Sequence, residues 1–180
     1  MIIIVEGIDR VGKTTLCNKL SKTLNIPIHK YNGIVPYKKM KNKQETNAML
    51  GLIQLVEETK TDIIFDRFHL TDYIYGVLER AYNEKKAYKN MKLIFERLGL
   101  YSLVDSVLLI LVRPSNIKKS SKEDGRDLQL YSAMFDEAYE VVQADSNLSN
   151  SIVFTSVEYN GIDELVNSLN VIYGREKNDK

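Results

Sequence analysis

The amino-acid sequence predicts an α/β fold of three layers, in which a five-stranded parallel sheet has helices on both faces. Two observations support this prediction. Five short runs of apolar, largely β-branched residues have the composition of buried strands. The segments between them place an apolar residue at every third or fourth position, as amphipathic helices do. Strands that alternate with helices form a parallel sheet, and the connecting helices cover both of its faces.

The predicted strands are short. The first of them has the composition of a strand in the interior of a sheet. It begins at Ile2 and is apolar at every position, without the alternation of a strand that faces water on one side. Pro27 limits the second strand to the start or edge of a sheet, because proline has no N–H to donate. The five predicted strands are residues 2–5, 26–29, 63–65, 107–112 and 152–154.

Six helices are predicted from the spacing of apolar residues. The first runs from Lys13 to Leu24, and the fourth ends at Gly99, a residue type common just beyond a helix. The helix that follows the fourth strand is expected to turn these residues inward: Leu130, Met134, Ala138, Val141 and Val142. The last helix is expected to bury Ile162, Leu165, Val166, Leu169 and Ile172.

The composition describes a chain with balanced charge and one cysteine. Its 180 residues predict a single domain over residues 1–180. Lysine and arginine number 25 and aspartate and glutamate 24, so the net charge of +1 speaks against a nucleic-acid partner, which favours strongly basic domains. No apolar run could span a bilayer and no signal peptide is apparent, so a soluble cytoplasmic protein is expected. Cys17 excludes an internal disulfide and is expected to be buried.

The turn between the first strand and the first helix carries the most specific motif. Residues 7–14 match G-x-x-x-x-G-K-[ST] without a mismatch, in the required strand-to-helix context. Gly7 and Gly12 let backbone N–H groups point at phosphates, and the start of the helix adds a favourable dipole. Lys13 is expected to reach the β- and γ-phosphates of ATP, and the Thr14 hydroxyl to ligate Mg²⁺. The motif therefore predicts a P-loop NTPase fold.

Two charged residues inside the loop add information, because the turn itself does not need them. Asp9 and Arg10 lie between the two glycines. Arg10 is a candidate arginine finger, which would offset the charge on a phosphoryl group during transfer. A solvated surface arginine is the alternative.

A second charged pair follows the third predicted strand. Asp66 at this strand end would face the phosphates, where it can hold Mg²⁺ through water or accept a hydroxyl proton. Arg67 can clamp a substrate phosphate with two hydrogen bonds. The alternative is a surface ion pair, worth under about 1 kcal/mol. His29 and His69 have no Cys or His partner at metal-ligand spacing, so both are predicted to be surface or rim residues.

These motifs together resemble the thymidylate kinase family. Residues 5–15, VEGIDRVGKTT, are similar to the opening of that family in the form that carries its catalytic arginine in the loop. Residues 66–75, DRFHLTDYIY, resemble its Asp-Arg-Tyr segment and the Ser and Ala-Tyr positions that follow. The basic stretch of residues 115–127 lies where the family's lid begins, and residues 152–169 resemble its closing strand and helix.

The resemblance implies nucleotide substrates and a role for each motif. Arg10, Lys13, Asp66 and the lid residue Arg126 would be catalytic, and Thr14 with Asp66 would hold the Mg²⁺. The residues implied at the ATP phosphates are Gly7, Asp9, Arg10, Val11, Gly12, Lys13, Thr14 and Thr15. The residues implied at the acceptor nucleotide are Asp9, Gln54, Arg67, Phe68 and Tyr75. The family also implies a homodimer.

Three departures from the family leave the acceptor base open. Gly76 stands where the family usually has Gln, and residues 47–54 lack the usual aromatic and Arg, although Gln54 can read a base edge. Residues 29–33 replace the family's Arg-Glu-Pro-Gly turn. The reaction best supported is dTMP + ATP to dTDP + ADP.

Other functions fit the P-loop less well. A deoxynucleoside kinase, with a 5′-hydroxyl acceptor, would use Asp66 as base, and a related kinase could take another deoxynucleotide. A GTPase switch lacks its D-x-x-G and N-K-x-D motifs in this sequence. A kinase acting on DNA has only the lysine cluster of residues 38–43 in its favour, and this cluster is expected to be a solvated loop.

Overall fold

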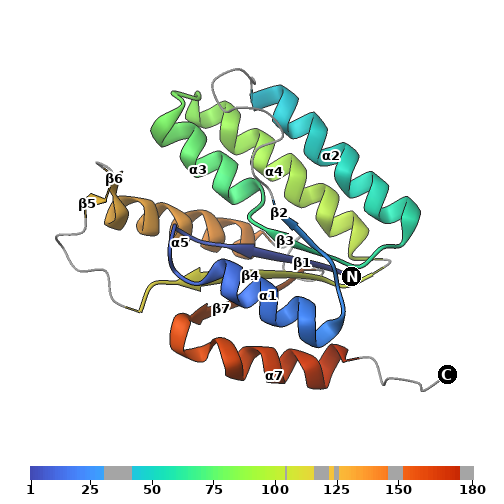
Figure 1. Ribbon diagram of the computed structural model, residues 1–180. Coiled ribbons are helices and arrows are strands. Elements are labelled where there is room, and N and C mark those ends of the chain that lie inside the picture. The colour runs from blue at the N-terminus through green and yellow to red at the C-terminus, as the bar shows by residue number, and fades with distance from the viewer. Residues whose placement is uncertain (31–41, 104, 116–121, 124–125, 146–151, 175–180) are drawn as a thin grey trace.

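The computed structural model describes residues 1–30, 42–103, 105–115, 122–123, 126–145 and 152–174. These residues form a sheet with helices on both faces (Figure 1). The sheet has five strands in the order β2-β3-β1-β4-β7, and all neighbouring pairs are parallel. The predicted three-layer α/β fold is therefore confirmed. The strands are β1 (Ile2–Glu6), β2 (Ile28–Lys30), β3 (Ile63–Asp66), β4 (Val107–Arg113) and β7 (Ile152–Glu158).

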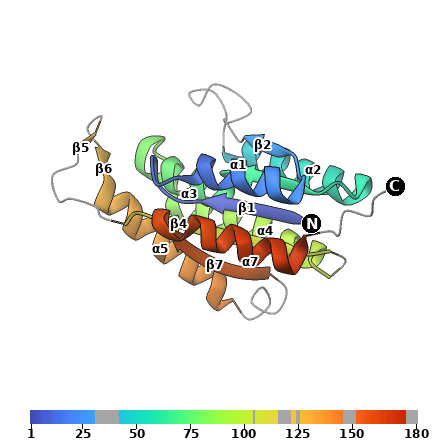
Figure 2. The ribbon, with the colours of Figure 1, turned by 60° about the horizontal axis from the view of Figure 1, so that its bottom comes forward.

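The helices divide into two groups (Figures 1 and 2). Helices α1 (Lys13–Leu24) and α7 (Ile162–Tyr173) pack together on one face of the sheet. The other face carries α2 (Asn42–Thr59), α3 (His69–Glu79), α4 (Glu84–Tyr101) and α5 (Leu128–Ala144). The shorter elements are β5 (Lys122–Glu123), β6 (Arg126–Asp127) and the 3₁₀ turn η1 (Tyr159–Gly161). Within the described ranges, no helix has the length and apolar character needed to cross a bilayer.

Strand β1 is the centre of the core. All five of its residues are buried, because helices cover it from both sides and β3 and β4 cover its edges. Its register sets Val5 opposite Asp66 of β3 and opposite Ile110 of β4. The carboxyl ends of these three strands therefore lie at one edge of the sheet, where ligands bind in folds of this type.

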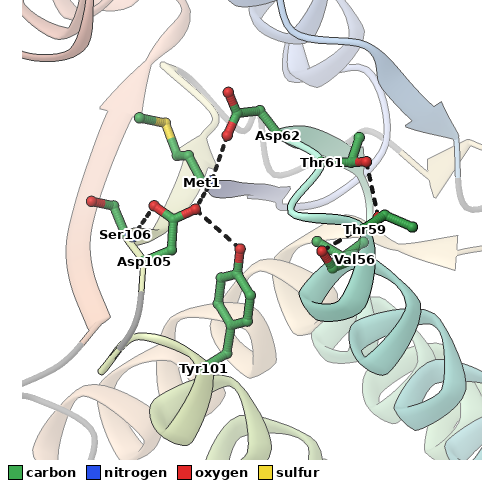
Figure 3. A network of polar contacts seen from close by, with 8 residues as sticks. All are labelled: Met1, Val56, Thr59, Thr61, Asp62, Tyr101, Asp105 and Ser106. Atoms are coloured by element: carbon green, nitrogen blue, oxygen red, sulfur yellow. Dashed lines mark hydrogen bonds and ion pairs between the residues drawn. The ribbon is translucent and has the colours of Figure 1, made fainter.

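The amino ends of the same strands are joined by a separate polar network (Figure 3). The Met1 amino group forms an ion pair with Asp62 at 2.6 Å and a second with Asp105. The carboxylate of Asp105 also accepts hydrogen bonds from the Ser106 amide at 2.7 Å and the Tyr101 hydroxyl at 3.2 Å. These contacts hold the starts of β1, β3 and β4 together at the edge opposite the P-loop.

Two helix predictions were wrong in detail. Helix α4 does not end at Gly99 but continues to Tyr101, whose buried side chain packs in the core with Leu98. In α5, Ala138 and Val142 are buried as predicted, but the other inward positions are shifted by one residue from the prediction. Leu130 and Val141 are 48% and 40% exposed, whereas the buried residues are Tyr131, Phe135, Ala138, Tyr139 and Val142. The aromatic side chains take the inward positions because they bury the larger apolar surface.

The spacing of apolar residues also predicted one position of the last helix wrongly. Ile162, Val166 and Leu169 of α7 are buried as predicted, but Ile172 is 67% exposed. The second strand also lies further along the chain than predicted, at residues 28–30 rather than 26–29. Cys17 is buried, as expected, and burial raises the pKa of its thiol far above the usual range.

Candidate active site

The loop between β1 and α1 has the geometry that the G-x-x-x-x-G-K-[ST] motif requires. Gly7 and Gly12 have φ angles of 134° and 101°, a region that side-chain-bearing residues rarely adopt. A Cβ atom on Gly7 would lie 2.4 Å from the carbonyl oxygen of Val112, so the backbone of β4 excludes any larger residue. Arg10, between the glycines, also has a positive φ of 63°. The loop is therefore held in one tight conformation directly before α1.

Lys13 lies inside this loop rather than in solvent. Its side chain is 4% exposed, and its Nζ donates a hydrogen bond to the carbonyl oxygen of Ile8 in the same loop. Burial, together with the nearby charge of Arg67, lowers the pKa of Lys13 to about 8, although the carboxylates of Asp9 and Glu6 act in the opposite direction. A phosphate anion beside the ammonium group would favour its charged form.

The P-loop is connected to β3 by a hydrogen bond between two predicted metal ligands. The Thr14 hydroxyl donates to Oδ2 of Asp66 at 2.8 Å, and Asp66 is only 6% exposed. A hydroxyl and a carboxylate oxygen are donors that Mg²⁺ prefers. The described ranges hold no group of three or more His, Cys, Asp or Glu residues that would bind a metal by themselves. A magnesium ion here would complete its coordination with phosphate oxygens and water, as it does in phosphoryl-transfer sites.

Arg67 follows β3 and contacts the P-loop through Asp9. It forms an ion pair with Asp9, and its backbone φ of 75° directs the chain out of the strand direction. Burial acts to lower the pKa of Arg67, but the hydrogen bond and charge of Asp9, with the nearby Tyr75 and Glu6, raise it overall. The guanidinium group is therefore fixed as a cation at the edge of the loop.

These groups surround a cavity of about 300 Å³ at the carboxyl edge of the sheet. Its walls carry three cationic side chains together with the two threonines of the motif. The lining residues are Arg10, Gly12, Lys13, Thr14, Thr15, Arg67 and Tyr159. A positively charged cavity beside a helix N-terminus is suited to a polyphosphate.

Tyr159 belongs to this cavity and was not predicted from the sequence. It follows β7, which extends to Glu158, four residues beyond the predicted strand end. A Cβ atom on Gly12 would lie 2.6 Å from Cδ2 of Tyr159, so the ring packs directly on the P-loop. The ring is 55% exposed and offers a flat surface on which a nucleotide base can stack. Only the fold brings residues 12 and 159 together.

Four of the five predicted acceptor residues do not line the cavity. Asp9 forms the ion pair with Arg67, the one that does, and the other three lie elsewhere. Phe68 is fully buried and packs on Phe65, with 4.9 Å between ring centroids. Tyr75 is 6% exposed and packs on Tyr131 of α5 at 5.1 Å. Gln54 is exposed on α2 and donates a hydrogen bond to Glu58 of the same helix at 2.8 Å.

Other predictions fall partly outside the described residues. In the predicted lid, residues 116–121 and 124–125 are not described, and the parts that are described form the antiparallel pair β5 and β6. The backbone of Arg126 lies in β6, but its side chain is outside the described part of the chain. Residues 38–41 of the predicted lysine cluster also lie outside the described part of the chain.

The prediction that His69 lies at the surface is wrong. Its side chain is 3% exposed, within the first turn of α3. Nδ1 of His69 lies 3.6 Å from the carboxylate of the equally buried Asp72, and Arg80 lies 3.6 Å from the same carboxylate. The side chain is buried because α3 places its first turn against the end of β1, which a linear sequence does not reveal.

Solved structures with a similar fold include a thymidylate kinase and a deoxyadenosine kinase. YorR from Bacillus subtilis, in complex with phosphorylated GDP, has a TM-score of 0.65 and 21% identity, over 100% of this chain and 99% of YorR. Thymidylate kinase from Candida albicans has a TM-score of 0.57 and 18% identity, over 96% and 90% of the two chains. Deoxyadenosine kinase from M. mycoides has a TM-score of 0.52 and 20% identity, over 95% and 100%.

The likeness covers nearly the whole chain and establishes the fold that this protein shares with these three proteins. No protein-family model and no curated protein matches the chain. The assignment of chemistry therefore depends on the residues of the cavity itself.

Gly7→Ala tests the P-loop geometry. We expect it to lower the free energy of unfolding by about 2 kcal/mol or more, because the residue must keep a positive φ and its Cβ meets backbone that cannot move away. Urea unfolding gives the stability and calorimetry with Mg²⁺-ATP gives the affinity, which we expect to fall as well. Gly51→Ala is the matched control, since nothing lies within 4 Å of its Cβ position and α2 should gain about 0.5–1 kcal/mol. Equal effects of the two substitutions would contradict the assigned loop geometry.

Proposed function

We propose that this protein is a Mg²⁺-dependent nucleotide kinase that transfers the γ-phosphate of ATP to a deoxynucleoside monophosphate, with dTMP as the leading acceptor. The main support is that one cavity contains two separate groups suited to phosphates. The P-loop with Lys13 suits the donor, and Arg67, directly after the neighbouring strand β3, suits a phosphate-bearing acceptor. The fold shared with thymidylate kinase from Candida albicans is consistent with this reaction.

Each side chain has a role in this proposal. Backbone N–H groups of the loop and Lys13 bind the β- and γ-phosphates. Thr14 and Asp66 hold Mg²⁺, which neutralises phosphate charge when it is bound. Arg67 binds the acceptor phosphate, whose oxygen attacks the γ-phosphorus as the bond to the β-phosphate oxygen breaks. Arg10 lies in the same cavity and stabilises the charge that spreads over the transferred group.

Further parts of the proposal rest on the family resemblance. We propose that residues 1–180 act as one domain, that the lid of residues 115–127 closes over the phosphates with Arg126, and that the protein is a homodimer. The exposed ring of Tyr159 lines the same cavity as the P-loop, and we propose that the base of ATP stacks on it.

A deoxynucleoside kinase is the second candidate. The supporting observation is the buried Asp66 carboxylate, bonded to the cavity residue Thr14, which can accept the proton of a 5′-hydroxyl. The fold shared with deoxyadenosine kinase from M. mycoides is consistent with it. The ion-paired Arg67 favours the monophosphate reaction, because a guanidinium group matches a phosphate better than a neutral hydroxyl.

The substrate class is tested by ADP release from Mg²⁺-ATP with dTMP, dUMP, dGMP, dCMP, dAMP and the free nucleosides. We expect turnover with one or more monophosphates, fastest with dTMP, and little with nucleosides. Lys13→Ala is the control and should abolish turnover with circular dichroism unchanged. Faster turnover with nucleosides would select the second candidate, and no turnover with any acceptor would contradict the proposal.

Arg10→Ala separates chemistry from binding. If Arg10 stabilises the transferred phosphoryl group, the substitution should lower kcat by roughly 10³ with little change in KM. Steady-state kinetics with the best acceptor measures both constants. Arg80→Ala removes an arginine at the C-cap of α3 that does not line the cavity, and it should change kcat far less. An effect of Arg10→Ala on KM alone would make Arg10 a binding residue.

A further inference from the structure

A buried carboxylate connects the two segments that form the cavity. Glu6 is the last residue of β1, directly before Gly7, and none of its surface is exposed. Its Oε1 accepts hydrogen bonds from the backbone amides of Phe68 at 2.9 Å, Leu70 at 3.0 Å and Thr71 at 3.3 Å. Its Oε2 accepts a further one from the Thr71 hydroxyl at 2.5 Å.

These bonds replace a missing helix cap. The first turn of a helix leaves its amides without partners inside the helix, and a side chain at the N-cap position usually accepts from them. The N-cap of α3 is Phe68, which has no side-chain acceptor. Glu6 accepts from these amides across 62 to 65 residues of sequence, and the positive end of the α3 dipole favours its charge.

The same carboxylate constrains the backbone of Arg67. With φ at 75°, Arg67 has a left-handed conformation that persists only where the surroundings hold it. The Arg67 amide donates to the Val5 carbonyl at 3.0 Å, and the next amide, that of Phe68, donates to Glu6. The last two residues of β1 therefore hold the chain on both sides of the Arg67 Cα atom.

Opposing effects act on the charge of Glu6. Burial raises the pKa of Glu6 to about 7, while the hydrogen bonds from Thr71 and the charges of Lys13 and Arg67 act to lower it. A carboxylate without such partners would be costly to bury. Its four hydrogen bonds and two nearby cations explain why an ionisable side chain occupies the interior here.

We propose that Glu6 is a positioning residue for the acceptor phosphate, which fixes the turn at Arg67 so that the guanidinium group faces Asp9 and the P-loop. This inference rests on the proposed function, in which Arg67 binds that phosphate. Glu6 itself touches neither substrate. It acts by holding the residues between Asp66 and Thr71 in the one conformation that completes the cavity.

Glu6→Gln tests this role because it keeps the size of the side chain but removes its charge. The charged hydrogen bonds to the α3 amides weaken, so the Arg67 turn should relax and its guanidinium group should lose its fixed position. We expect the Kd of the tightest-binding monophosphate of the panel to rise about tenfold or more. The Kd of AMP-PNP with Mg²⁺ should change less than about twofold, since the hydrogen bonds of Glu6 go to the segment from Phe68 to Thr71 and not to the P-loop side chains. Amide exchange at Phe68 and Leu70 should accelerate, while that of Ile3 stays slow.

Ile94→Val is the control for a general loss of stability. Ile94 is fully buried in α4, outside the cavity, and its substitution should lower Tm without changing either affinity. If Glu6→Gln does not fold, Thr71→Val removes only the hydroxyl bond to Oε2 and should weaken monophosphate binding selectively.

Unchanged monophosphate affinity in Glu6→Gln, or an equal loss for monophosphate and AMP-PNP, would overturn the inference. The proposed function is judged separately by turnover. A wild-type protein that binds a monophosphate without transferring phosphate contradicts the proposed function, and the Glu6 comparison still decides the positioning role. A wild-type protein that binds no monophosphate contradicts both.

Discussion

The parallel pairing of β1 with β3 is the constraint on which the candidate site depends. The register that sets Val5 opposite Asp66 brings the start of the P-loop and the Asp66–Arg67 turn to the same edge of the sheet. A shift of this pairing by one residue would reverse the direction of every following side chain. Thr14 could then no longer donate to Asp66, and Glu6 could no longer reach the amides of α3.

Charge is concentrated and balanced at this edge. The cations Lys13 and Arg67 lie close to three carboxylates, those of Glu6, Asp9 and Asp66. Two of these carboxylates have positional roles, because Glu6 caps α3 and Asp9 holds Arg67. A polyphosphate with its metal ion would enter a site whose cations are already oriented, so little rearrangement is needed on binding.

Contiguous motifs could be predicted from the sequence, and contacts between distant segments could not. The P-loop and the Asp66–Arg67 pair each depend on neighbouring residues and a strand end, so pattern and context were sufficient. Tyr159 reaches the cavity only because β7 and β1 end at the same edge. The prediction misplaced part of the inward face of α5 by one residue, because Leu130 and Tyr131 fit the apolar spacing equally well. Packing in the fold selects the aromatic side chain.

We propose that the P-loop and the end of β3 act as one magnesium-nucleotide site. A double-mutant cycle with Thr14→Ala and Asp66→Asn measures whether the two residues act together. The quantity measured is the Mg²⁺-dependent affinity for ATP, obtained by calorimetry. If they share one ion, the double variant should lose little more affinity than the worse single variant, with a coupling energy of about 1 kcal/mol or more. Losses that simply add would mean that the two residues act independently, and would contradict a shared site.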